Sequence, residues 1–372
     1  MSAQPDTAVE VDGLSKNYGP VVALSSVSFA IESGQYFVLL GPSGGGKTTL
    51  LRLIGGFIRP SQGRVLLHGR DVGDLPPNKR PTSMVFQSYA LFPHMSVERN
   101  VAYGLKLRKV AAPEIGERVE RMLELAGLTG YNARMPHELS GGQQQRVQLA
   151  RSLVLESDIL LLDEPLASLD AKLRKDMCLE LKRIQEKVGI TFIHVTHNQE
   201  EAMTIADRIA IIANGRLVEE GTARDVYERP RRRFTADFIG DNNLLDGTVA
   251  GISDGRVTVD LGYATVAVIA IDAPGSPGYQ VAVGDAVSLS MRSELVELVA
   301  PGGADDGARE SIPATYVEEV YLGLTTSHLV RLPDGTEVAV RRISGDQDAA
   351  PPASGQEVRV GWKTASARLH AE

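Results

Sequence analysis

Residues 37–49 read Phe-Val-Leu-Leu-Gly-Pro-Ser-Gly-Gly-Gly-Lys-Thr-Thr, and this stretch decides the fold. It begins as a short apolar run, which is typical of a parallel strand buried on both faces. The run leads into G-x-x-x-x-G-K-[ST], a phosphate-binding loop that follows a strand and opens a helix. Glycines there let backbone N–H groups converge on phosphate oxygens, and the helix N-terminus adds positive potential. The motif alone predicts a nucleoside triphosphate as ligand.

The side chains of this loop have expected roles. Lys47 places its charge on the β- and γ-phosphates, and the Thr48 hydroxyl binds Mg²⁺. A glycine-rich turn without a ligand is the alternative, but the strand before the loop and the helix after it favour binding. The expected nucleotide-binding residues of the loop are Gly41, Pro42, Ser43, Gly44, Gly45, Gly46, Lys47, Thr48 and Thr49.

A second apolar run, residues 159–162, ends in two acids. Asp163 stands where a Mg²⁺ shell needs a carboxylate. Glu164, one residue further, is expected to orient or deprotonate a water aligned on the γ-phosphate. Adjacent acids at a strand end would by themselves indicate an exposed turn. Paired with the phosphate-binding loop, they predict a site that hydrolyses the triphosphate.

The chain is organised as two domains. Up to about residue 240, buried-strand patterns alternate with helical ones, which predicts an α/β domain with a mostly parallel sheet. A helical insertion is expected at about 96–150. From residue 241 to 372, short segments alternate apolar and polar residues, which predicts a small all-β barrel or sandwich. The strands expected in the first domain are 37–40, 159–162, 191–195 and 209–212, and the helices are 113–126, 143–156, 170–187 and 198–206.

Composition excludes several classes of protein. The 372 residues include 39 Lys plus Arg, 47 Asp plus Glu, one cysteine and 43% hydrophobic residues, as in a soluble globular protein. No apolar run approaches the roughly 18 residues of a membrane helix, and no secretion signal is recognised at the N-terminus. Residues 1–240 have a net charge of +2 and residues 241–372 a net charge of −10. The basic cluster 229–233 is best read as a solvated turn, so no nucleic-acid partner is expected.

A further motif resembles one that is specific to a known protein family. Residues 139–146, Leu-Ser-Gly-Gly-Gln-Gln-Gln-Arg, resemble the signature sequence of ABC-type ATPases. A capped helix start is the alternative, with Ser140 as N-cap. The resemblance implies an α/β P-loop ABC ATPase cassette with a RecA-like core and a helical insertion, in which two copies sandwich two ATP molecules. In that arrangement the signature residues contact the γ-phosphate held by the partner's loop, and they are Ser140, Gly141, Gly142 and Gln143.

Other positions match the same family in order along the chain. Tyr18 stands where the family has an aromatic residue stacked on adenine, although a packed or surface tyrosine is the alternative. Gln87 matches the Q-loop glutamine, Asp170 the D-loop and His197 the switch histidine, although a lone histidine is more often structural. Asn198 departs from the family, which usually has aspartate there, so a local charge contact is in doubt.

The resemblance implies ATP hydrolysis by Glu164, His197, Gln87 and Lys47, with Mg²⁺ held by Thr48, Gln87 and Asp163.

The resemblance extends to importers that have a C-terminal TOBE-type, OB-like β-domain. Residues 88–97 resemble the segment that receives a permease helix, with core packing as the alternative. Met291–Glu294 and Tyr321–Gly323 match TOBE landmarks, although Ser293 departs from the usual sequence. The implied role is a peripheral ATPase subunit on the cytoplasmic face of the cell membrane. Its implied partners are a second copy, two transmembrane permeases and an extracellular or periplasmic substrate-binding protein. A soluble ABC ATPase of nucleic-acid repair or translation is the distant alternative.

Several segments have amino-acid sequences most similar to those of ATPases for spermidine and putrescine import. Importers of ferric iron, sugars and other organic ions share much of this sequence, so these cargoes remain alternatives. The sequence leaves open the cargo, the affinity of the dimer without ATP, the identity of the permeases and any regulatory ligand of the C-terminal domain. The segments that carry this likeness are 142–146, 179–185, 188–192 and 238–245.

Overall fold

The computed structural model describes residues 6–87, 91–253, 255–269, 281–299, 309–345 and 351–371. The chain divides into two compact units, Met1–Ala223 and Arg224–Glu372. The sequence places the boundary after residue 240, whereas this division falls earlier. The reason is that α8 (Arg233–Phe238) packs on strands of the second unit, and the buried Arg292 donates hydrogen bonds to the carbonyls of Tyr227 and Ile239.

The first unit is built on a mostly parallel sheet, in the order β10-β9-β3-β8-β7-β6. Only the terminal strand β10 runs antiparallel to its neighbour. The strands at the centre are buried along their whole length, which explains their continuous apolar sequences. The strands are β3 (Tyr36–Leu40), β6 (Thr82–Val85), β7 (Ile159–Asp163), β8 (Thr191–Thr196), β9 (Arg208–Ala213) and β10 (Arg216–Gly221).

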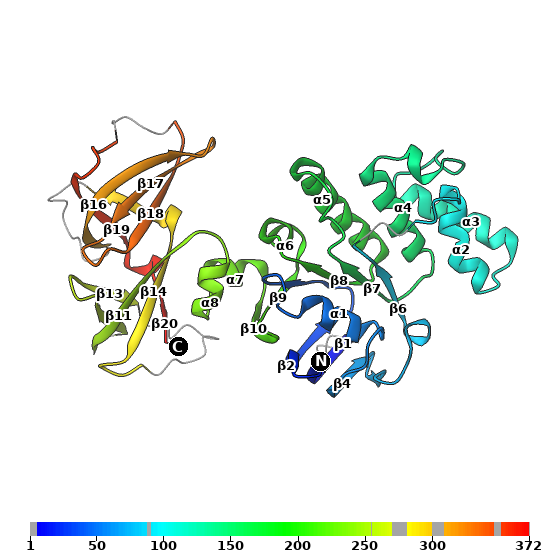
Figure 1. The fold of residues 1–372 in the computed structure, drawn as a ribbon, viewed down its shortest axis with the longest axis horizontal. Helices are drawn as coiled ribbons and strands as arrows, with labels where there is room; N and C mark the ends of the chain where they lie inside the picture. The colour runs from blue at the N-terminus through cyan, green and yellow to red at the C-terminus, as the bar shows by residue number, and fades with distance from the viewer. Residues whose placement is uncertain are drawn as a thin grey trace, which may run out of the picture. The chain divides into compact units, whose positions relative to one another are not determined.

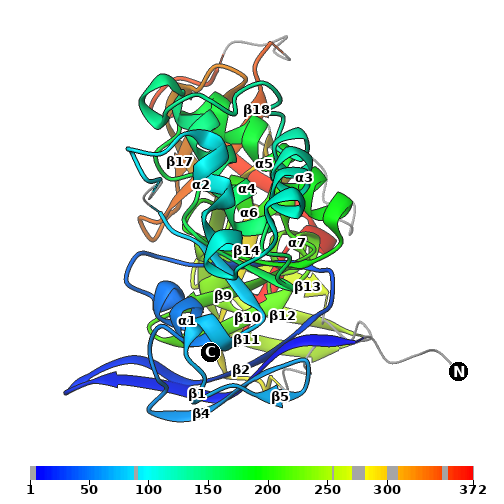
Figure 2. The same ribbon diagram turned by 90° about the vertical axis from the view of Figure 1, so that its right-hand side faces the viewer.

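An antiparallel sheet, which the sequence analysis did not identify, completes this core. Its order is β2-β1-β4-β5, and Figure 2 shows it beneath α1. Apolar side chains of β1 and β2, including Val9 and Leu24, share one buried cluster with Phe37 of the parallel sheet and Leu50 of α1. The elements are β1 (Thr7–Tyr18), β2 (Val21–Glu32), α1 (Lys47–Ile54), β4 (Gln62–Leu67) and β5 (Arg70–Asp71).

The helical insertion lies between β6 and β7 and gathers beside one end of the sheet (Figure 1). Its first helix is capped by Ser96, whose side chain accepts a hydrogen bond from the Arg99 amide. The helices of the insertion are α2 (Val97–Leu107), α3 (Ala112–Leu125) and α4 (Gly141–Leu153), and those that follow are α5 (Ala171–Val188) and α6 (Gln199–Ile205). The expected α/β cassette with an insertion is thereby confirmed.

The second unit is built from antiparallel sheets that share one core. One has the order β13-β12-β11-β14-β20 and another the order β15-β19-β16-β17-β18, and the buried Trp362 belongs to the cluster between them. The strands are β11 (Asn242–Ser253), β12 (Arg256–Asp260), β13 (Thr265–Ile269), β14 (Ala286–Arg292), β15 (Val296–Val299), β16 (Arg309–Tyr321), β17 (Thr325–Arg331), β18 (Glu337–Ile343), β19 (Glu357–Lys363) and β20 (Arg368–His370), and the helix before α8 is α7 (Ala223–Glu228). Across the described residues, every helix is too short or too polar to span a bilayer.

Candidate nucleotide-binding site

The phosphate-binding loop turns sharply between β3 and α1. Gly41 has φ 155°, and a Cβ at this position would lie 2.0 Å from Ile212 O. Gly46 has φ 106°, and a Cβ there would lie 2.7 Å from Ala23 O. Only glycine fits both positions, because a side chain would collide with the backbone of neighbouring strands. Gly41 and Gly46 are therefore required by the packing of the loop against its neighbouring strands.

We expect Gly41→Ala to destabilise the first unit by about 3 kcal/mol, because strain and overpacking act together. Far-UV circular dichroism during urea unfolding reports this unit, which contains the long helices. Fluorescence of Trp362, the only tryptophan, reports the second unit and should be unchanged. Gly116→Ala in α3, where a Cβ meets nothing within 4 Å, is the control and should stabilise by about 0.5 kcal/mol. Equal unfolding curves for the two variants would contradict the steric argument.

Lys47 is buried against its own loop. Its Nζ donates hydrogen bonds to the carbonyl oxygens of Gly41 and Pro42, each at 2.8 Å. Burial lowers the pKa of Lys47, while the charges of Glu164 and Asp163 oppose that shift. The ammonium group is thus held beside the glycine backbone, where it would meet a phosphate bound in the loop.

Asp163 joins the loop to the end of β7. The Thr48 hydroxyl donates to Asp163 Oδ1 at 3.0 Å, and Arg52 Nη2 lies 4.0 Å from Asp163 Oδ2. Burial raises the pKa of the Asp163 carboxyl, and the bond from Thr48 opposes this. A hydroxyl and a buried carboxylate in contact are the oxygen donors that Mg²⁺ prefers, so the two residues fit a magnesium ion.

Three expected catalytic side chains converge beyond this pair. Gln87 Nε2 donates to Glu164 Oε2 at 3.4 Å, and His197 Nδ1 lies 3.4 Å from Glu164 Oε1. Each residue follows a strand of the parallel sheet, where β6, β7 and β8 are neighbours. Glu164 has φ 45°, and its amide donates to Val195 O. The carboxyl ends of adjacent parallel strands therefore bring together residues that are far apart in sequence.

The signature residues form a separate feature at the start of α4. Ser140 Oγ accepts from the Gln143 amide at 3.4 Å, and Gln143 Oε1 accepts from the Ser140 amide at 2.9 Å. This reciprocal capping box satisfies two backbone N–H groups at the start of α4. Within the described residues, no hydrogen bond or ion pair connects residues 140–143 to residues 41–49 or to Glu164.

Tyr18 and Asp170 are also placed by the structure. Tyr18 ends β1 with half of its surface exposed, and Lys16 Nζ lies 5.1 Å from its ring centroid. Asp170 caps α5 by accepting from the Leu173 amide at 3.0 Å. Neither residue is brought into contact with the loop 41–49 by a hydrogen bond that the structure describes.

Sequence reasoning missed Arg52, which lies near Asp163. A signal was present, since Arg52 follows Thr48 by one helical turn on α1 and so shares its face. It also missed the exposed Val21 and Val22, which follow the turn after Tyr18. Their exposure next to an aromatic residue extends the apolar surface of this hairpin.

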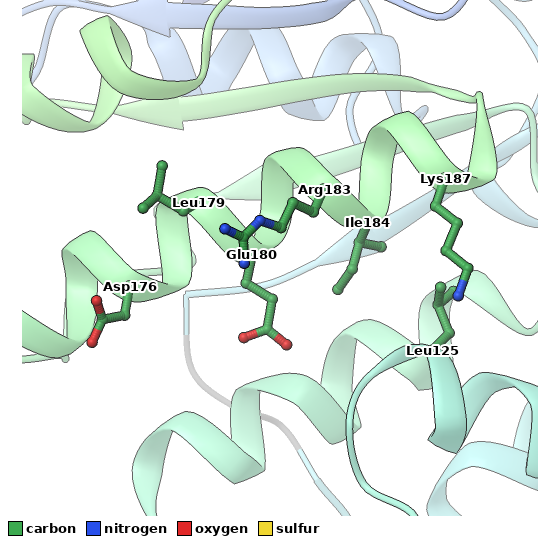
Figure 3. A pocket seen from close by; sticks show the side chains of 7 residues that line it. All are labelled: Leu125, Asp176, Leu179, Glu180, Arg183, Ile184 and Lys187. Carbon is green, nitrogen blue, oxygen red and sulfur yellow. The ribbon is translucent and has the colours of Figure 1, made fainter.

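A pocket of about 520 Å³ lies elsewhere, along α5 (Figure 3). Its lining comes from α5, including Glu180 and Arg183, together with Leu125 of α3. Glu180 is paired there with Arg146 of α4, so the pocket marks the junction between α5 and the helical insertion. None of the expected nucleotide-binding or catalytic residues lines this pocket.

The segment expected to receive a permease helix is described in part, because residues 88–90 lie outside the described residues. Phe92 packs on Tyr103 of α2, with 4.6 Å between ring centroids, and so belongs to the packing of the insertion. Nearby, Phe57 and Phe86 meet edge to face at 5.6 Å and remain 44% and 37% exposed. Phe86, which directly precedes Gln87 in the sequence, thus forms a partly exposed aromatic pair with Phe57.

Comparison with known proteins gives matches over both units. The model for "ABC transporter" matches residues 24–167, and the model for "TOBE domain" matches residues 289–369. The spermidine/putrescine import ATP-binding protein PotA of Rubrobacter xylanophilus is 45% identical, with 95% of this chain and 91% of that protein covered. The protein of the same name from Roseobacter denitrificans is 43% identical, with 99% of each chain covered.

Solved structures of ABC transporter ATPases are similar to more than half of the chain. The cbiO1 protein of Clostridium perfringens, part of an ABC transporter complex, is 31% identical with a TM-score of 0.56, covering 59% of this chain and 90% of that one. A dimeric ATP-binding cassette in a post-hydrolysis state, bound to ADP and Pi, is 30% identical with a TM-score of 0.52, covering 58% and 99%. The chain therefore belongs to the family of ABC transporter ATP-binding proteins with a TOBE domain, whose members bind ATP and are ATPases coupled to transport.

Proposed function

We propose that the chain is the ATP-hydrolysing subunit of a polyamine importer, peripheral to the cytoplasmic face of the cell membrane. The convergence of Gln87 and His197 on Glu164, next to the Thr48–Asp163 pair, carries the hydrolytic part of this proposal. The relatives named for spermidine and putrescine import, at 43–45% identity over nearly the whole chain, support the cargo. Ferric iron, a sugar or another organic ion is the alternative cargo for the same role.

The proposed chemistry is phosphoryl transfer to water, which depends on positioning and charge neutralisation more than on covalent help. Lys47 leaves its loop carbonyls to contact the β- and γ-phosphates, and Glu164 orients or deprotonates the attacking water. Gln87 and His197 hold the Glu164 carboxylate and flank the γ-phosphate. Thr48, Asp163 and Gln87 would hold Mg²⁺, which supplies positive charge against the phosphate oxygens.

The active form in this proposal is a head-to-tail pair of copies. Ser140 and Gln143 cap a helix whose positive end suits a γ-phosphate, yet they are not joined to the chain's own loop. A second copy would bring its loop to this helix. The neighbouring cassette whose dimer holds ADP and Pi supports such a pairing, and Tyr18 would stack on the adenine beside Val21 and Val22.

The permease would dock beside the Q-loop. Phe86 directly precedes Gln87 and forms with Phe57 a pair of partly exposed rings, and exposed aromatic rings suit the apolar face of a short helix. Movement of that helix would then be transmitted to Glu164 through the contact between Gln87 and Glu164. The complete importer in this proposal has two copies of the ATPase, two permease subunits and a substrate-binding protein.

The cargo proposal is tested in lipid discs that contain the ATPase together with permeases and a binding protein, which are to be sought among the neighbouring coding sequences. We expect the binding protein loaded with spermidine to raise ATP turnover about tenfold over the empty binding protein. Discs with Glu164→Gln should hydrolyse ATP roughly 1,000-fold more slowly in both cases. Stimulation by ferric iron or a sugar, without stimulation by spermidine or putrescine, would instead assign the alternative cargo.

A further inference from the structure

The first turn of α5 carries an arginine directed back at the loop before the helix. Arg174 Nη2 donates to the carbonyl oxygen of Leu169 at 2.7 Å. Asp170 in the same loop caps the helix through the Leu173 amide. Arg174 therefore fixes the backbone of residues 168–170, the segment that resembles the D-loop, from within its own chain.

The first turn of α6 holds the segment around His197 in a comparable way. Glu201 Oε2 accepts from the Thr196 hydroxyl at 2.7 Å, and that hydroxyl accepts from the Asn198 amide at 3.0 Å. The Asn198 side chain in turn accepts from the Glu201 amide at 3.0 Å. Both neighbours of His197 are thus tied to Glu201, and Asn198 performs the capping role that an aspartate would also serve.

An ion pair between Arg174 and Glu201 connects the first turn of α5 to the first turn of α6. Arg174 Nε lies 3.4 Å from Glu201 Oε1, with the N–H poorly aligned for a hydrogen bond. One oxygen of the Glu201 carboxylate thus faces the arginine that holds Leu169, and the other binds the threonine before His197. α5 and α6 pack against each other along this contact.

Arg174 is the counter-ion of this buried carboxylate. Burial raises the pKa of Glu201, while Thr196 and then Arg174 oppose the shift. His194 Nε2 lies 3.7 Å from the carboxylate, but burial lowers the pKa of His194 to about 3. His194 is therefore neutral and is held by Tyr36 through Nδ1 at 3.0 Å. Removing Arg174 would leave a buried charge unpaired.

We propose that Arg174 and Glu201 are positioning residues that fix His197 and the 168–170 loop relative to each other, so that one cannot shift without the other. Among the described contacts, neither side chain bonds to the loop 41–49 or to Glu164, and both act through the segments that they hold. The inference rests on the proposed hydrolytic function for its kinetic consequence, but the positioning of His197 can be measured without turnover.

The kinetic test uses the full chain with Arg174→Met, Glu201→Gln, the double variant and Arg174→Lys. We expect each of the first two to lower kcat about tenfold with KM for ATP changed less than twofold, because Lys47 and its loop are untouched. The double variant should also be about tenfold slower rather than a hundredfold, a coupling of about 1.4 kcal/mol. Arg174→Lys should recover part of kcat, and Lys175→Met, an exposed neighbour on α5, should match the wild type.

A second measurement separates this inference from the proposed function. In nucleotide-free protein with labelled histidines, the His197 side-chain NMR signal, assigned with His197→Ala, should shift in Arg174→Met and remain in place in Lys175→Met. An unmoved signal or additive kinetic losses would overturn the positioning role. Absence of ATP hydrolysis by the wild type would overturn the proposed function instead, while the NMR comparison would still decide the role of Arg174.

Discussion

Replacing Glu164 by glutamine is expected to lower ATP turnover roughly 1,000-fold while ATP still binds, because only the proton-accepting oxygen is lost. The amide keeps the shape of the carboxylate, and Lys47, Thr48 and Asp163 retain their contacts. Turnover is measured by phosphate release and binding by calorimetry with Mg-ATP. The blocked enzyme should also accumulate as a dimer of the 40.0 kDa chain when ATP is present, because opening follows hydrolysis.

The matched control for this prediction is Glu200→Gln. Glu200 is an exposed acid in the first turn of α6, close in sequence to His197 but without a contact to Glu164 among the described ion pairs. It should hydrolyse ATP at the wild-type rate. Turnover by Glu164→Gln within a few fold of this control would remove Glu164 from the role of general base.

The parts of the fold that the sequence predicts are those with a strong local pattern. Residues 37–40 and 159–162 are continuous apolar runs because their strands are covered on both faces. The sheet that contains β1 was not predicted, since β1 has shifts of register against β2, among them one between Val11 and Leu14. Such irregularities interrupt the alternation by which a half-buried strand is recognised.

The candidate site also contains residues that the sequence predicts and residues that it does not. Contiguous motifs identify the loop 41–49 and the residues 140–143, and the ends of adjacent strands place Glu164 near His197. The Arg174–Glu201 pair could not be predicted, because its members lie on different helices and neither belongs to a motif with a fixed spacing. The resting contacts of Lys47 with its own loop also escape sequence reasoning, since they depend on how the backbone turns.

The proposed contact of Ser140 with a γ-phosphate can be tested in a mixed dimer, which distinguishes a partner's nucleotide from the chain's own. In the Glu164→Gln background, two differently tagged chains are paired, one with Lys47→Ala and one with Ser140→Arg. If each site combines the loop of one copy with the signature helix of its mate, a mixed dimer has one intact site and one doubly damaged site. We expect about one slowly exchanging ATP per mixed dimer, and none in dimers of either variant alone, measured by release of labelled ATP into excess unlabelled ATP.

The opposite arrangement, with each ATP held wholly within one chain, leaves every site of the mixed dimer with a single lesion. Mixed and parent dimers would then release ATP equally fast, and the proposed pairing would be wrong. Trapped ATP is the better readout than turnover, because coupling between two sites could silence hydrolysis even when one site is intact. Pairing is the arrangement that we expect, because the first turn of α4 has positive potential and no hydrogen bond or ion pair among the described residues joins residues 140–143 to the chain's own loop 41–49.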